Sequence, residues 1–214
     1  MKSQLQSSGR KRNFAEALGV IVTSSSVPRV AGEIGDPNSN PAGTLYETTV
    51  FEDFLREMRE GLHPASLKSL IACRDVLVSR GAGCVTTSCG LLWPAQSSLE
   101  LGCPVPFVSS SLCLLDRLRG KIPEGMCVVT VDAGFKPYWQ SLHIPELKSV
   151  DFCELGRDSY LYRALTGQVS PADFSTEQAE RSILDRLHSY CAEFPETSGF
   201  ILECTNLSPY FSSI

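Results

Sequence analysis

The feature that most constrains the fold of this chain is a regular alternation of short apolar runs with longer amphipathic stretches. The short runs are rich in β-branched residues, as buried strands are, and the longer stretches repeat apolar residues at helical spacing. Such an alternation predicts βα units that build a mostly parallel sheet, and therefore an α/β fold. The candidate strands are residues 18–23, 84–87, 105–109, 126–131, 148–153 and 199–203.

Two of the amphipathic stretches carry helix signals at their ends. Residues 64–80 place apolar side chains at helical spacing and stop before a glycine, which favours the end of a helix. In residues 175–194, Ser175 and Gln178 have the spacing of a capping box. Cys191 lies on the apolar face of this stretch and is therefore expected in the core. Five other cysteines within apolar patterns carry the same expectation: Cys73, Cys84, Cys113, Cys127 and Cys153.

A long polar loop follows the first candidate strand. Residues 24–41 contain three prolines and two glycines. A structureless loop of this length is uncommon inside a compact domain and is usually functional. We therefore expect it to cover a site.

Composition places the chain among globular proteins and limits its partners. Hydrophobic residues make up 43% of the 214 residues and charged residues 20%, as in ordinary folded domains. The 19 Lys and Arg against 24 Asp and Glu leave a net charge of -5, so no basic surface is expected for nucleic acid or an anionic membrane. The apolar runs are far shorter than the roughly 20 residues of a membrane-spanning helix.

The cysteine content favours a reducing compartment. The chain has nine cysteines, an odd number, and no recognisable secretion signal. We therefore expect a cytoplasmic protein. The polar, basic residues 1–13 are expected to form a disordered tail, and an organelle transit peptide is the alternative for the same segment. No cysteines or histidines have the close pairing typical of zinc ligands, so no metal site is expected.

Two segments far apart in the chain share a pattern in which an apolar strand ends in a small-residue turn that holds a cysteine. These segments, residues 85–90 and 201–206, place Cys89 and Cys204 at the carboxyl ends of strands, where open α/β sheets bind ligands. A thiol in such a turn faces the unpaired amide groups of the next helix, which favour the thiolate. We therefore expect the pKa of each thiol to fall from about 8.5 toward neutrality.

Two such thiols on either side of one carbon can invert a stereocentre without a cofactor. The thiolate takes a proton from one face, and the protonated thiol returns a proton to the other. Four nearby hydroxyl and amide side chains are suited to bind a substrate carboxylate and to stabilise the charge that develops on it. They belong to Thr87, Ser88, Thr205 and Asn206. The residues alone leave open a second interpretation, in which both cysteines are buried structural residues in Ser/Thr-rich turns.

The cysteine segments also resemble a known family. Residues 83–92, 104–112 and 202–210 are similar to segments of the aspartate/glutamate/hydantoin racemase superfamily. The loop at residues 28–36 is similar to that family's first loop, and the whole similarity spans residues 18–214. The Thr-Ser-Cys-Gly and Glu-Cys-Thr-Asn motifs are specific as a pair. The resemblance implies two pseudo-symmetric, Rossmann-like α/β lobes with mostly parallel sheets and the active site between them.

The resemblance further implies a cofactor-independent mechanism with Cys89 and Cys204 as the two bases. It divides the chain into a first lobe at residues 14–110 and a second at residues 111–214, with a final strand that is exchanged between lobes or missing. Residues 207–214 would form about two helical turns, whereas family members continue with a full helix and a further strand. We therefore expect a shortened chain with an exposed sheet edge.

Substrate contacts follow from the same resemblance. Family members often place a polar residue after the first strand, and Ser24 and Ser25 are the nearest candidates here for contacting a substrate amino group. Gly90 completes the expected substrate-binding residues of the first cysteine turn. Arg29 is a further candidate because its planar guanidinium suits a carboxylate. A solvated turn and a solvated Arg are the alternatives.

These features predict an amino-acid racemase of the aspartate/glutamate type. Its partner would be a small carboxylate or amino-acid substrate, with no nucleic acid and no membrane, and homo-oligomer formation is compatible with this prediction. The same resemblance also allows a maleate-type cis–trans isomerase or a malonate-type decarboxylase, although two cysteines favour racemisation or isomerisation. A catalytically silent relative that binds a small acid is the alternative from a different class.

Overall fold

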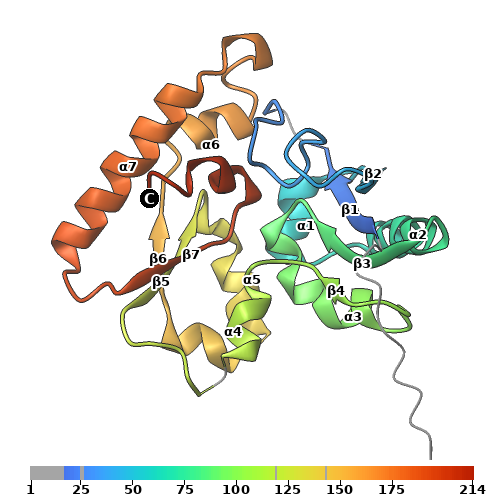
Figure 1. The fold of residues 1–214 in the computed structure, drawn as a ribbon. Helices are drawn as coiled ribbons and strands as arrows, with labels where there is room; N and C mark the ends of the chain where they lie inside the picture. The colour runs from blue at the N-terminus through green and yellow to red at the C-terminus, as the bar shows by residue number, and fades with distance from the viewer. Residues whose placement is uncertain (1–16, 25–26, 119, 143) are drawn as a thin grey trace, which may run out of the picture.

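The computed structural model describes residues 17–24, 27–118, 120–142 and 144–214. These residues form two parallel sheets, which lie side by side and are flanked by helices (Figure 1). The architecture confirms the predicted α/β fold class with parallel sheets. The predicted tail at residues 1–13 lies outside the described residues.

The first sheet has the strand order β2-β1-β3-β4, and each neighbouring pair is parallel. Its strands are β1 (Ala17–Thr23), β2 (Leu45–Thr49), β3 (Ala82–Thr87) and β4 (Phe107–Val108). The helices of this half are α1 (Phe54–Glu60), α2 (Pro64–Ser79) and α3 (Gln96–Glu100). Helix α2 packs against β1, β2 and β3 and so covers the centre of this sheet.

The second sheet has the order β6-β5-β7, again with parallel pairs. Its strands are β5 (Met126–Thr130), β6 (Asp151–Glu154) and β7 (Gly199–Leu202). The helices of this half are α4 (Cys113–Arg117), α5 (Lys136–Ser141), α6 (Tyr160–Leu165) and α7 (Thr176–Glu193). Short 3-10 helices are η1 (Gly90–Ala95), η2 (Ala133–Phe135), η3 (Pro145–Ser149), η4 (Pro171–Asp173) and η5 (Thr205–Tyr210).

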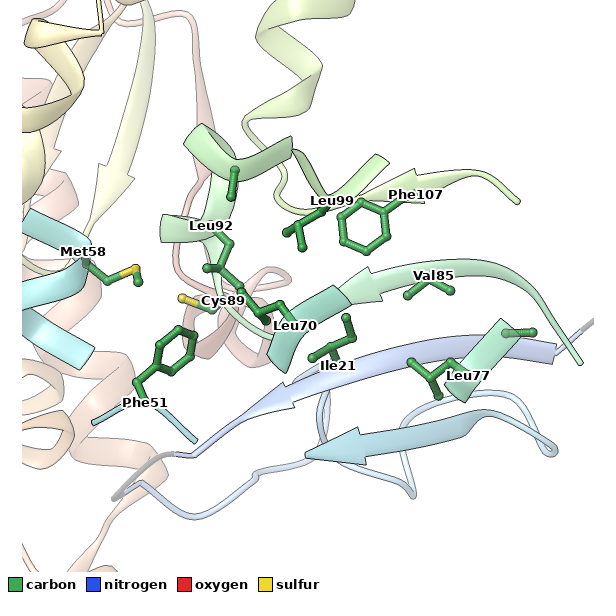
Figure 2. Packing of buried hydrophobic residues seen from close by; sticks show 12 residues of the cluster. Ile21, Phe51, Met58, Leu70, Leu77, Val85, Cys89, Leu92, Leu99 and Phe107 are labelled. Atoms are coloured by element: carbon green, nitrogen blue, oxygen red, sulfur yellow. The ribbon is translucent and has the colours of Figure 1, made fainter. Parts of the chain in front are cut away.

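Buried apolar side chains form a core against each sheet. In the first half, Ile21 of β1, Val85 of β3 and Leu77 of α2 belong to one cluster (Figure 2). In the second half, Ile183 and Leu187 of α7 belong to the cluster that covers β5 and β6. Full burial of such side chains stabilises the fold by about 1.5–3 kcal/mol each.

A third apolar cluster joins the two halves. Trp93 of η1 and Trp139 of α5 meet edge to face, with ring centroids 5.4 Å apart. Val128 of β5 and Ile201 of β7 belong to the same cluster. The segment that follows β3 is therefore packed directly onto the second sheet.

Most predicted elements lie where the sequence pattern placed them, and the differences are local. The segment predicted as a strand at residues 148–153 begins three residues later, because residues up to Ser149 form η3 and β6 starts at Asp151. Strand β2 was not predicted, and of the helices only α2 and α7 were predicted by range. The proposed lobe boundary at residues 110 and 111 falls between β4 and α4 and stays a prediction.

Of the described helices, none combines the length and the apolar character needed to cross a membrane.

The prediction that Cys84 is buried is wrong. Successive strand side chains point to opposite faces, so Val85 of β3 enters the core and Cys84 is exposed. Cys73 and Cys191 are half-buried. The other cysteines of that set, Cys113, Cys127 and Cys153, are buried as expected.

Only half of the predicted capping box at α7 forms. The Ser175 hydroxyl accepts the backbone N–H of Gln178 at 3.2 Å, as an N-cap should. The backbone N–H of Ser175 donates to the Tyr160 hydroxyl at 2.8 Å and not to Gln178. A tertiary contact with α6 thus replaces the second bond of the box.

Candidate active site between the two sheets

A cavity of about 290 Å³ lies where strand ends from both sheets meet. Residues that follow β1 and β3 form part of its wall, and residues that follow β5 and β7 form another part. This is the position at which parallel α/β sheets carry ligands. The predicted site residues in the wall are Ser24, Ser88, Cys89, Gly90, Cys204, Thr205 and Asn206. Ser25 lies outside the described residues.

Thr87 lies behind the cavity and not in its wall. Its hydroxyl donates to the backbone carbonyl of Ser109 at 2.6 Å and accepts the backbone N–H of Cys89 at 3.3 Å. The side chain is buried. Thr87 therefore fixes the turn that carries Cys89, and its hydrogen-bonding capacity is already used by the backbone.

Cys89 opens η1 at the end of β3. Its extended backbone, with φ of -148°, turns the chain out of the strand, and the residue is 8% exposed. The sulfur points toward Met58 and Phe51 in the apolar cluster of the first half (Figure 2). The backbone N–H groups of Leu91 and Leu92 donate toward the sulfur and favour its thiolate form.

Cys204 opens η5 in the same way at the end of β7. It is half-buried, and the side-chain amide of Asn206 donates to its sulfur with Nδ2 and Sγ 3.6 Å apart. The hydroxyl of the next residue, Thr205, donates to the backbone carbonyl of Ser88 at 2.9 Å. This bond links the two cysteine turns directly across the two sheets.

Glu203 is a candidate site residue that was not predicted from the sequence. It lines the cavity between β7 and Cys204, is only 3% exposed, and accepts the Thr130 hydroxyl at 2.9 Å through Oε2. Burial raises the pKa of its carboxyl from 4.5 to about 7, against the opposing effect of the Thr130 hydrogen bond. An acidic residue at the end of an otherwise apolar strand was the sequence signal that could have identified it.

Glu203 and Gly90 bring the two turns into close contact. A Cβ atom at Gly90 would lie 1.9 Å from the backbone oxygen of Glu203 and 2.5 Å from its Oε1. Any side chain at this position would collide with the opposite turn. Glycine is therefore required immediately after Cys89 for the halves to meet as they do.

The predicted lowering of the thiol pKa values is wrong in this structure. Burial raises the pKa of Cys204 to about 12 and also raises that of Cys89, and in both cases the negative charge of Glu203 adds to the effect. The amide groups favour the thiolates as expected, but their contribution is smaller than that of burial. The sequence pattern predicts the backbone amides that favour a thiolate, but it does not predict that the thiols are buried in surroundings of low polarity.

The long loop after β1 brings a cation to the cavity. Arg29 lines the wall, donates to the backbone carbonyl of Thr23 and lies 3.4 Å from the Ser88 hydroxyl through Nη2. Its Nη1 lies 3.0 Å from Oε1 of Glu33, a fully buried carboxylate that also accepts the Gly35 N–H at 2.8 Å. Glu33 therefore holds the guanidinium in place at the cavity.

An ion pair joins the two halves beside the cavity. Asp132, which follows β5 and lines the cavity, accepts from Nη2 of Arg59 in α1 at 2.7 Å. The backbone N–H of Gly134 donates to its other oxygen at 2.8 Å. Asp132 is thus fixed by groups from both halves of the molecule.

The rest of the wall is largely apolar. It is contributed by α1, by η1 and by the segments around β5 and α6. The apolar and aromatic lining residues are Phe54, Leu55, Leu91, Val131, Tyr162 and Leu165. The cavity therefore combines two thiols, one described basic side chain and an apolar surface.

The fold is similar to that of a solved aspartate racemase, as the resemblance predicted. The structure is similar to that of the aspartate racemase of Picrophilus torridus, with a TM-score of 0.52, 11% identity, and coverage of 91% of this chain and 83% of that chain. An aspartate racemase homologue from Pyrococcus horikoshii OT3 has a TM-score of 0.48 and 14% identity, with coverage of 90% of this chain and 86% of that chain. An unliganded arylmalonate decarboxylase has a TM-score of 0.49 and 11% identity, with coverage of 87% of this chain and 77% of that chain. Identities this low establish the fold alone. No family model matches the sequence, and no curated protein is recognisably similar to it.

Proposed function

We propose that this protein is a cofactor-independent isomerase that inverts the α-carbon of a small carboxylate, with Cys89 and Cys204 as its two bases. The observation that carries the proposal is the convergence of two thiols, from turns on different sheets, on one cavity that also contains a guanidinium. The racemase-type fold supports it. The finer assignment to amino acids of the aspartate/glutamate type rests on the sequence resemblance.

The proposed reaction needs only groups of this chain. The substrate carboxylate binds at Arg29, which places the α-carbon between the thiols. One cysteine, as thiolate, takes the α-proton, and the electron pair of the C–H bond passes into the carboxylate to give an enediolate. The other cysteine gives its thiol proton to the opposite face. The product is the mirror-image centre, and the two sulfurs have exchanged protonation states.

Polar groups in the two turns support the developing charge. In the proposal, Ser88, Gly90 and Thr205 line the wall beside the enediolate, and the Asn206 amide stabilises the Cys204 thiolate through its bond to Sγ. Thr87 acts by holding the Cys89 turn.

Nine free thiols, all in the described part of the chain, support the proposed cytoplasmic location.

The lining favours a second candidate substrate class within the same chemistry, namely a carboxylic acid with an apolar α-substituent. A dicarboxylate needs a second cation, and among the described lining residues Arg29 is the basic one. The apolar wall formed by residues such as Val131 and Leu165 suits an alkyl or aryl group. Arg29→Lys keeps the positive charge but removes the planar guanidinium that can bind a carboxylate through two N–H groups. KM for any carboxylate substrate should therefore rise by about tenfold.

Solvent deuterium incorporation tests the proposed function. Each enantiomer of aspartate, glutamate and a set of alkyl- and aryl-substituted acids is incubated with the protein in deuterium oxide, and the α-position is followed by NMR together with chirality. Exchange coupled to inversion is expected for one of the two substrate classes. Binding in a thermal-shift assay without exchange for any acid would identify a silent relative, and release of carbon dioxide from a malonate would identify a decarboxylase.

A further inference from the structure

Glu203 lies at the point that the two cysteine turns share. It immediately precedes Cys204, it lines the same cavity as Cys89, and its Oε1 and backbone oxygen lie against Gly90, the residue after Cys89. Burying a carboxyl group at such a point is unfavourable unless its charge is compensated or neutralised. Its position therefore suggests a chemical role beyond packing.

The groups that face Glu203 do not compensate a full negative charge. Thr130, at the end of β5, donates one hydrogen bond to the carboxylate. Asp132 lines the same cavity and is paired with Arg59, while Arg29 is paired with Glu33. No salt bridge joins Glu203 to a basic side chain among the described residues. The titratable groups nearest to it in the turns are the two thiols.

We propose that Glu203 is a third proton-holding residue of the site and that it shares one negative charge with the thiols of Cys89 and Cys204. The proposal rests on the proposed function for the identity of the reacting thiols. A proton passes from one thiol to the Glu203 carboxylate, which leaves a thiolate beside a carboxylic acid. One S–H bond breaks, one O–H bond forms, and the net charge of the site stays constant.

Electrostatics limits the site to one negative charge near neutral pH. Negative charges close together in a buried cavity repel each other more strongly than in water. Burial raises the pKa of Glu203 to about 7, and its charge in turn raises the pKa of both thiols. Below about pH 7, where Glu203 is protonated, the fraction of thiolate rises with pH. Above about pH 7 the site already carries its one negative charge, so the fraction of thiolate stays constant.

Alkylation of the thiols at different pH values tests this without a substrate. Iodoacetamide reacts with the thiolate, and mass spectrometry of peptides reports on Cys89 and Cys204 separately. In the native protein the rate should rise about tenfold per pH unit up to about pH 7 and then level off. Glu203→Gln keeps the shape but cannot hold the charge, so the rise should continue and the rate at about pH 9 should exceed the native rate by about a hundredfold.

A second variant keeps the carboxyl and moves its titration. Thr130→Val removes the hydrogen bond that favours ionised Glu203, so the levelling-off should move to higher pH. The exposed Cys84 is the internal control, and its alkylation should depend on pH in the same way in all three proteins. Circular dichroism establishes that each variant is folded.

Coincident curves for native protein and Glu203→Gln would overturn the proposal, as would a levelling-off that Thr130→Val leaves in place. Because the measurement uses no substrate, its outcome is separate from that of the proposed function. A protein that shows the shared charge but inverts no carboxylate would support the role of Glu203 and contradict the racemase assignment.

Discussion

The two cysteine turns have the same backbone plan but different surroundings. Each follows a parallel strand and opens a 3-10 helix. The sulfur of Cys89 lies among apolar side chains such as Met58, whereas that of Cys204 receives the amide of Asn206. The backbone therefore sets where the thiols lie, and the neighbouring side chains set how readily each loses its proton. Two turns that look alike in sequence need not be chemically equivalent.

The largest expected effect comes from removing either thiol. Cys89→Ala and Cys204→Ala should each lower the racemisation rate by at least about a hundredfold, because inversion needs both a proton acceptor and a proton donor. Each variant should retain α-proton exchange from one enantiomer only, and the two variants should retain opposite ones. Chiral chromatography and deuterium incorporation measure both quantities.

Cys84→Ala and Cys103→Ala are the matched controls for the thiol variants, since neither residue lines the cavity. Both should keep the parent racemisation rate. Parent-rate racemisation by a folded Cys89→Ala or Cys204→Ala protein would rule out two bases. Loss of activity in Cys204→Ala alone would indicate single-cysteine chemistry. In that case only the Cys204 turn would take part in the reaction.

The residues after the two cysteines, Gly90 and Thr205, give the next comparison. Gly90→Ala should lower the free energy of unfolding by about 3 kcal/mol or more, because the new methyl group meets the backbone of Glu203. Gly43→Ala is the control: its Cβ meets no atom within 4 Å, and only its positive φ of 90° is unfavourable, at about 1–2 kcal/mol. Equal denaturant midpoints for the two variants would show that the turns can move apart freely.

Glu203 should make stability depend on pH. Its folded-state pKa of about 7 lies above the unfolded value of 4.5, so the folded protein binds the proton more tightly, and stability is lost as pH rises through this window. Relative to Glu203→Gln, the native protein should lose about 3 kcal/mol of unfolding free energy between about pH 4.5 and about pH 8. Parallel urea titrations measure the difference, and a constant difference would contradict the raised pKa.

The smallest expected effect concerns the bond between the turns. Thr205→Val should lower the free energy of unfolding by about 1 kcal/mol, because it removes the hydrogen bond to the Ser88 carbonyl. Thr44→Val, which loses an exposed bond to the carbonyl of Pro41, should cost less. Thermal unfolding of both variants measures the contrast. A larger loss for Thr44→Val would mean that the link between the turns contributes little.

The sequence pattern predicted the strands that have apolar, β-branched runs, and it missed the one that does not. Strand β2 (Leu45–Thr49) is an edge strand whose residues are mostly part-exposed, so it shows little of the signal of a buried strand. Its neighbour β1 is central and mostly buried, and its pattern was clear. Periodicity thus reports burial within the sheet more than pairing itself.

The candidate site was predictable where local sequence sets it and not where distant segments meet. The positions of Cys89 and Cys204 at strand ends follow from strand–turn–helix patterns alone. The burial of Glu203 follows from its contact with Gly90 of the other half, and the raised thiol pKa values follow first from the burial of the thiols themselves and then from the nearby charge of Glu203. Such contacts depend on how two sheets pack, which no local pattern contains.

The contact between Trp93 and Trp139 gives the molecule a built-in optical reporter. These are the two tryptophans of the chain, and their rings meet where the segment after Cys89 packs on the second sheet. Intrinsic tryptophan emission therefore originates at the junction of the two halves and nowhere else in the molecule. Any ligand that changes the distance between the two sheets should shift the wavelength of the emission maximum and change its intensity. Binding can therefore be followed in real time without a label.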